Sequence, residues 1–165
     1  MKKILLFFGT IALFAIVLMS SDTAYKYGNY VPVFMDRADL EKSVKFVAER
    51  RMLITPGKIY YKSPYVYINE RYKGIHIIDN TDPKNPRNVG FITAPGCIDI
   101  AAKGNILYLD NSVDLVAFDL ITLKEIERVR DVFPEPISPE KISFLGGERP
   151  TPYSVIVEWK KIGEE

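Results

Sequence analysis

The chain has 165 residues, 47% of them hydrophobic and 12% aromatic, with 22 basic and 21 acidic residues and a formal net charge of +1. This composition can form one packed domain and excludes a chain that is disordered throughout, while the balanced charge gives no basis for binding nucleic acid or an anionic membrane surface. The single cysteine, Cys97, and the single histidine, His76, exclude an internal disulfide and a cysteine-rich zinc site. We therefore predict no metal and no cofactor.

Residues 1–21 have the layout of a secretory signal peptide. Two lysines precede an apolar run over residues 4–19, and two serines follow it. As a helix this run would be about 24 Å long, which is shorter than a hydrocarbon core of roughly 30 Å. No A-x-A motif follows the run, so an uncleaved membrane anchor stays open as the alternative. In both cases we expect export to the periplasm or cell surface, with membrane contact only through this segment.

Residues 22–56 are predicted to hold a linker and a short amphipathic helix. The first part of this region, up to Pro32, is polar and contains tyrosines, which indicates an extended linker. Asp36 can then cap a helix that ends near Arg50. The residues expected on the apolar face of this helix are Leu40, Val44 and Val47. We expect the helix to pack against the strands that follow.

Residues 57–133 are predicted to form two series of four antiparallel strands, separated by turns rich in proline, glycine and asparagine. The first series comprises residues 58–62, 65–70, 74–79 and 87–94, and the second comprises residues 97–102, 106–110, 114–120 and 124–133. The last segment is ambiguous. Its apolar residues recur at a spacing of three, which favours a helix, whereas its place in the series favours an outer strand; we adopt the strand.

The two series repeat with a period near forty residues. Tyr67 corresponds to Tyr108 at an offset of 41, and Asp79 corresponds to Asp119 at an offset of 40. Four antiparallel strands at this period are typical of a β-propeller blade, whose two faces are both covered by neighbouring blades. We therefore predict an all-β fold with two propeller-type blades in an incomplete ring, preceded by a short α-helix. A β-meander duplicated by chance is the alternative.

Residues 134–165 are predicted to form a proline-rich loop followed by one more strand. Residues 134–152 contain five prolines and two adjacent glycines, which indicates a long irregular connection. The apolar run over residues 155–159 has the composition of a strand, and a charged tail follows it.

The segments GKIYYKSPYVYINERYKGIHIIDNTDPKNP and DIAAKGNILYLDNSVDLVAFDL resemble the LVIVD-repeat proteins of bacteria. Residues 74–79 and 114–119 contain the two versions of the name-giving pentad, and the resemblance extends over residues 31–133. It implies an exported or surface-associated β-propeller and supplies no catalytic residues. The chain lacks the cysteine that would carry a lipid and has fewer repeats than typical members. It is therefore predicted to be a truncated form, a fragment, or a module that completes its ring with another copy.

Four polar residues are candidates for a binding rim, because they occupy equivalent places where the second strand of each series ends. They are Asn69, Glu70, Asp110 and Asn111. Asp79 and Asp119 end equivalent strands, and we predict that they cap turns, because the D-x-D-x-D-G spacing of a calcium loop is missing.

The sequence contains no G-x-S-x-G elbow, phosphate loop or H-E-x-x-H motif. His76 is predicted to be a packed or edge-exposed strand residue, Cys97 a small buried hydrophobe, and the strand tyrosines packing residues. We therefore predict a non-catalytic exported binding or interaction module, whose partner is an unknown protein, a glycan or another copy of the chain. The alternatives are a glycan-binding or glycan-processing surface protein, which would use the tyrosines and rim carboxylates, and a truncated remnant of a longer propeller protein.

Overall fold

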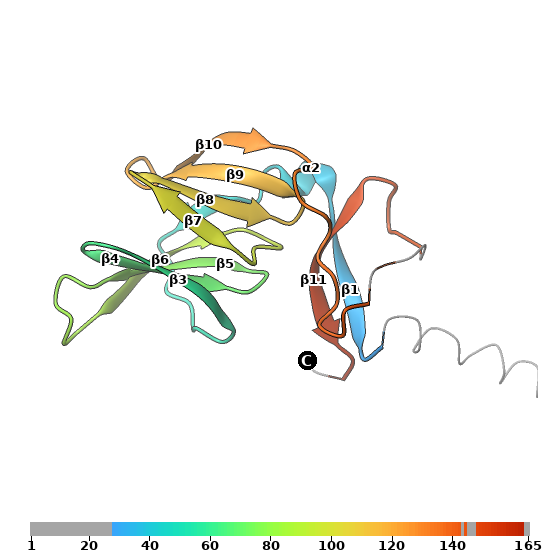
Figure 1. The fold of residues 1–165 in the computed structure, drawn as a ribbon, viewed down its shortest axis with the longest axis horizontal. Coiled ribbons are helices and arrows are strands. Elements are labelled where there is room, and N and C mark those ends of the chain that lie inside the picture. Colours follow the sequence, from blue (N-terminus) through green and yellow to red (C-terminus); the bar gives the residue numbers. More distant parts are fainter. Residues whose placement is uncertain (1–27, 143, 145–147, 164–165) are drawn as a thin grey trace, which may run out of the picture.

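The computed structural model describes residues 28–142, 144 and 148–163. These residues form three antiparallel β-sheets and one short helix (Figure 1), so the prediction of an all-β fold is confirmed. The predicted signal or anchor segment lies outside the described residues. Within the described part of the chain, no helix is both long and apolar enough to cross a membrane.

The first sheet has five strands in the order β2-β6-β5-β4-β3. Its strands are β2 (Lys45–Val47), β3 (Pro56–Lys62), β4 (Tyr65–Glu70), β5 (Gly74–Asp79) and β6 (Arg87–Thr93). Strands β3 to β6 confirm the first predicted series. Strand β2 is an addition, because it pairs with the outer edge of β6.

The second sheet has four strands in the order β10-β9-β8-β7. Its strands are β7 (Ile100–Lys103), β8 (Ile106–Asn111), β9 (Asp114–Asp119) and β10 (Lys124–Val129). The ambiguous segment is therefore a strand, as its place in the series favoured, although it ends at Val129. Strand β7 begins three residues later than predicted, because Ile98 and Asp99 donate their backbone N–H groups to a side chain.

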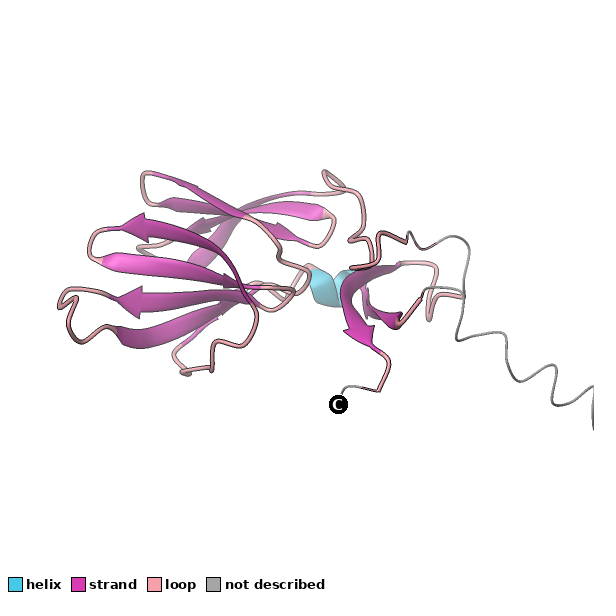
Figure 2. Cartoon of the chain, turned by 60° about the horizontal axis from the view of Figure 1, so that its bottom comes forward, coloured by secondary structure: helices cyan, strands magenta, loops and turns pink. Residues whose placement is uncertain are grey.

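The two large sheets stack face to face, and the main hydrophobic core lies between them (Figure 2). The first sheet contributes Tyr67, Ile75, Ile77 and Ile92, and the second contributes Leu107, Leu109, Val116 and Phe118. Each of these side chains is at most 6% exposed. Burial of this apolar surface is the main favourable term that holds the two sheets together. The described residues contain no closed barrel or propeller ring.

A third, two-stranded sheet corrects the predicted linker. Strand β1 (Tyr30–Asp36) pairs with β11 (Ser154–Lys161), which confirms the predicted terminal strand and lengthens it. The expectation of an unpaired linker is therefore wrong from Tyr30 onward, because its backbone pairs with residues more than one hundred positions away. Figure 1 shows this sheet beside the stacked pair.

The predicted helix is much shorter than expected. Asp36 does cap it, because its Oδ1 accepts the Ala38 N–H at 3.0 Å, but helix α2 (Arg37–Leu40) spans only four residues. The predicted continuation to Arg50 is wrong, because residues 45–47 extend and pair with β6 instead. Valine and phenylalanine at these positions suit a strand at least as well as a helix, so the available sheet edge decides.

Candidate functional site

The two large sheets carry matching cross-strand rows of side chains. Residues that pair directly across antiparallel strands point to the same face of a sheet. In the first sheet one such row runs through Tyr60, Tyr67, Ile77 and Gly90, and in the second sheet its counterpart runs through Ala101, Tyr108, Ala117 and Glu127. The first three positions of the two rows differ by 41, 41 and 40 residues, in agreement with the offsets read from the sequence, and the fourth differs by 37.

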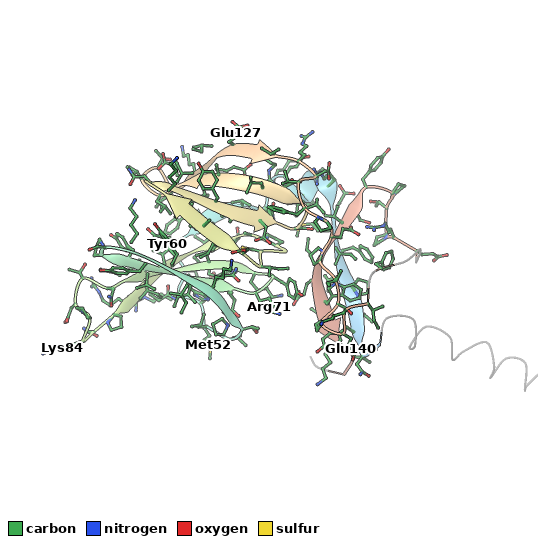
Figure 3. The ribbon with its side chains drawn as sticks, viewed as in Figure 1. Met52, Tyr60, Arg71, Lys84, Glu127 and Glu140 are labelled. Carbon is green, nitrogen blue, oxygen red and sulfur yellow. The ribbon has the colours of Figure 1, made fainter. Side chains whose placement is uncertain are left out.

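The first row faces the second sheet, whereas its counterpart faces away from the first sheet. Tyr67 is 4% exposed and Tyr108 is 37% exposed. Figure 3 shows the same relation at the labelled ends of the rows, with Tyr60 between the sheets and Glu127 on the opposite side of the second sheet. The face that carries this row is therefore covered in the first sheet. In the second sheet, no described sheet covers the corresponding face.

An apolar groove lies on this uncovered face. It has a volume of about 560 Å³ and runs between strands β7 to β9 and residues 133–137, the segment that follows β10. The sheet contributes Ala101, Tyr108 and Leu115 to its wall, and the segment contributes Phe133, Pro134 and Ile137. The volume and the mostly apolar lining are those of a small-molecule site. We refer to this feature as the groove.

Two of the three carboxylates that line the groove are paired with cations. The Asp99 carboxylate lies 2.6 Å from Lys58 Nζ at the exposed rim. The Glu135 carboxylate accepts two hydrogen bonds from Arg149, at 2.8 and 2.7 Å, and one from the Ile156 N–H at 3.1 Å. Burial opposes ionisation of Glu135, but these hydrogen bonds outweigh it and lower the pKa of its carboxyl group.

Asp110 is the third carboxylate, and it has no cationic partner among the described residues. Its Oδ1 accepts the N–H groups of Ile98 and Asp99 at 2.9 and 2.8 Å, and its Oδ2 accepts the Ile98 N–H at 3.0 Å. Burial raises the pKa of Asp110 above its ordinary value, although these backbone hydrogen bonds work in the opposite direction. Asp110 therefore places an unpaired negative charge in a largely apolar wall.

The other three residues of the predicted rim are buried and engaged inside the protein. Glu70 accepts the backbone N–H groups of Ile54, at 3.0 Å, and Thr55, and lies 3.2 Å from His76 Nε2. Asn69 donates from Nδ2 to the Gly74 carbonyl at 3.2 Å, while its Oδ1 is buried with no hydrogen-bond partner in the part of the chain described. Both side chains thus connect strand ends rather than face solvent.

Asn111 is likewise used within the protein. Its Nδ2 donates to the Pro95 carbonyl at 2.7 Å, and its Oδ1 accepts from Arg128 at 2.8 Å. The structure therefore brings only Asp110, of the four predicted rim residues, to the groove. Sequence reasoning missed the groove itself, because five of its fifteen lining residues come from residues 133–137, which the sequence pattern places at the end of a strand and in a loop.

Cys97 is buried, as predicted, and His76 is packed in the interior rather than exposed at a strand edge. His76 Nδ1 lies 3.2 Å from the Asn88 side-chain amide, whose oxygen already accepts the Gly90 N–H, so Nδ1 is the acceptor and Nε2–H donates to Glu70. Burial raises the pKa of the Cys97 thiol, which disfavours the reactive thiolate. The described residues contain no cluster of three groups that could hold a metal ion.

The predicted turn caps are present, whereas the strand tyrosines pack only in part, because Tyr61 is 59% and Tyr108 37% exposed. Asp79 Oδ1 accepts the Thr81 N–H at 3.0 Å, and Asp119 Oδ1 accepts the Ile121 N–H at 2.7 Å. Tyr67 packs against Tyr60 and Tyr65, with ring centroids 6.3 and 6.4 Å apart. Because Tyr67 is buried, this cluster does not form an open platform of the kind that binds sugars.

Comparison of the chain with protein-family models, with curated proteins and with solved structures finds no match. Membership of the LVIVD-repeat family therefore stays a prediction, and the function is inferred from the geometry of the groove.

Proposed function

We propose that this chain is a non-catalytic, exported binding module whose ligand site is the groove. The observation that carries the proposal is the open apolar wall of Ala101, Tyr108 and Leu115, whose counterparts in the first sheet pack against the second sheet. A ligand that covers this wall would gain the hydrophobic stabilisation that the corresponding wall obtains from sheet packing. The ligand is a small molecule with an apolar body.

We infer further that the two large sheets are propeller-type blades of the LVIVD kind. Three observations support this inference: the shared strand order, the position-by-position match of the rows, and the fact that matching rows point the same way around the stack. On this interpretation the groove lies where the next blade of a ring would pack. Export and attachment through residues 4–19 belong to the same proposal.

The proposal can be tested by filling the groove. Ala101→Trp places a large side chain in its wall, and Ala117→Trp makes the same change in the same row of the same sheet, at a position outside the lining. We expect decan-1-ol, followed by titration calorimetry, to bind the wild type and Ala117→Trp with equal affinity and Ala101→Trp at least tenfold more weakly. Equal binding by all three proteins, or no binding by the wild type, would contradict the proposal.

A second copy of the chain is the competing occupant of the groove. The outer side of the first sheet exposes Ile59 (66%) and Tyr61 (59%), and Met52 (82%) lies below the same sheet in Figure 3. An exposed apolar face of this kind is typical of an interaction surface. Our proposal predicts that the protein is a monomer by light scattering, whereas a closed ring built from several copies would have a defined multiple of the monomer mass.

A further inference from the structure

We propose that the groove selects an amphiphilic cation, a molecule with an apolar body and one ammonium group that meets the Asp110 carboxylate. This inference rests on the proposed function, and it adds the chemical class of the ligand. It follows from three features of the groove: its charge, its hydrogen-bonding capacity and its difference from the first sheet.

One of the three carboxylates in the groove has no cationic partner among the described residues. Asp99 and Glu135 have cationic partners, Lys58 and Arg149, so their charges are locally neutralised. Asp110 is held instead by the backbone N–H groups of Ile98 and Asp99 and by the neutral thiol of Cys97, none of which carries a charge. Attraction between unit charges strengthens as the local dielectric constant falls, so a half-buried carboxylate attracts an ammonium group more strongly than an exposed carboxylate does.

Asp110 also keeps hydrogen-bonding capacity that the protein does not use. An ionised carboxylate offers about four acceptor sites, and the hydrogen bonds to Asp110 come from two backbone groups and from the Cys97 thiol, a weak donor. Oδ2 accepts one backbone hydrogen bond, from Ile98 at 3.0 Å, whereas Oδ1 accepts two. An ammonium group can therefore donate to Oδ2 without displacing either backbone partner. The apolar body of the ligand would then lie along Tyr108 and Leu115.

The corresponding position in the first sheet carries no charge. Asp110 pairs with Leu115 across strands β8 and β9, as Asn69 pairs with Ile75 across β4 and β5. Asn69 is fully buried, and its Nδ2 lies within hydrogen-bonding distance, 3.2 Å, of Cys97 Sγ. A neutral amide thus occupies this position where another sheet covers it, and a carboxylate occupies it where the face is open. A carboxylate on an open face can meet a cation, whereas a buried neutral amide cannot.

The test compares three probes of equal chain length, all below their micellar concentrations: decylamine, decan-1-ol and decanoate. We expect the wild type to bind decylamine at least tenfold more tightly than decan-1-ol, and decanoate more weakly than either. Asp110→Asn should bind decylamine and decan-1-ol with similar affinity. Asp99→Asn removes a carboxylate that already has a cationic partner, so it should keep most of the preference for the amine.

A second measurement uses the wild type alone, so it does not depend on the stability of the Asp110→Asn protein. Decylamine should shift the NMR amide signals of Ile98 and Asp99, which bond to Asp110, by more than decan-1-ol does.

The outcomes separate the two proposals. Equal affinity for the amine and the alcohol, with both lost in Ala101→Trp, would overturn the selection of a cation and leave the binding function intact. Binding of none of the probes would overturn the binding function as well. A dimeric or larger mass that decylamine does not change would assign the groove to a second copy and overturn both.

Discussion

The two large sheets share a strand order and matching cross-strand rows, yet one row is buried and its counterpart is open. In the first sheet Tyr60 and Ile77 flank Tyr67 and pack against the second sheet, whereas in the second sheet Ala101 and Ala117 flank Tyr108. The groove thus has two causes: no described sheet covers the row, and alanines replace larger side chains within it. In a stack of similar sheets, a face that no other sheet covers can therefore form a binding site.

In both sheets a carboxylate near the end of one strand accepts backbone N–H groups of residues that precede the neighbouring strand. Glu70, at the end of β4, accepts N–H groups of Ile54 and Thr55, which precede β3. Asp110, near the end of β8, accepts N–H groups of Ile98 and Asp99, which precede β7. Glu70 is also in contact with His76 and is buried, whereas Asp110 borders the groove. The same structural role therefore leaves only one of the two carboxylates accessible to a ligand.

The largest expected effect on stability concerns Asp114, in the hairpin formed by β8 and β9. Where the first sheet has Gly74, the second has Asp114, which is fully buried and lies 2.8 Å from Arg128 and 2.9 Å from Arg37. Asp114→Ala would leave two largely buried guanidinium groups without this partner and should lower the free energy of unfolding by about 4 kcal/mol. Urea denaturation followed by circular dichroism measures this change.

Asp131→Asn is the control for Asp114→Ala, because asparagine tolerates the positive φ of 54° at this position. Asp131 is 76% exposed and lies 3.4 Å from the same Arg37, so the loss of its charge should change the free energy of unfolding by less than about 0.5 kcal/mol. Similar effects of the two substitutions would show that the buried ion pairs do not distinguish the second hairpin.

The next effect compares the two tyrosines of the matching rows. Tyr67→Ala removes a buried ring from between the sheets and should lower the free energy of unfolding by about 3 kcal/mol. Tyr108→Ala removes a partly exposed ring from the groove and should lower it by less than about 1 kcal/mol, while it weakens decan-1-ol binding. Equal losses of stability would mean that the two rows are equally covered, which contradicts the comparison.

The smallest effect concerns the turn that follows β5. Hydrogen bonds from the Thr81 hydroxyl and backbone, and from Arg87, lower the pKa of Asp79 from 3.8 to about 2. Because the folded-state pKa is depressed, the stabilisation is present above pH 4 and is lost as the pH falls toward 2. When the pH is lowered from 4 to 2, the urea midpoint of Asp79→Asn should therefore fall less than that of the wild type.

Thr81→Val provides the control for the turn. Alone, it removes the main hydrogen bond to Asp79 and should reduce the acid dependence. In the Asp79→Asn background it should leave the acid dependence unchanged. An additive effect in the double variant would assign the acid dependence to another group.

The strands of residues 57–133 could be predicted from the sequence because their signals are local: apolar runs bounded by turn-forming residues, and aspartates such as Asp79 and Asp119 that cap the turns. The pairing of β1 with β11 could not, because the two strands are more than one hundred residues apart and neither carries a signal for the other. The spacing of Leu40 and Val44 suited a helix equally well, and the free edge of β6 decided against it.

The groove could not be predicted from local sequence patterns. Tyr67 and Tyr108 look alike in the sequence, and only the stacking of the sheets shows that one is covered and the other is open. The sequence pattern places Asp110, with Glu70, Asn69 and Asn111, at strand ends, and the structure confirms this placement. Its accessibility depends on the path of residues 133–137, which local sequence patterns do not specify.

Methyl NMR during titration with decan-1-ol tests the central claim most directly, because it reports both sheets in one experiment. The neutral probe makes the result independent of Asp110. The account predicts that the methyl signals of Ile98, Leu115 and Ile137 in the groove shift, while those of Ile75 and Ile92, on the corresponding face of the first sheet, do not. Shifts confined to Met52 and Ile59, on the outer side of the first sheet, would contradict it.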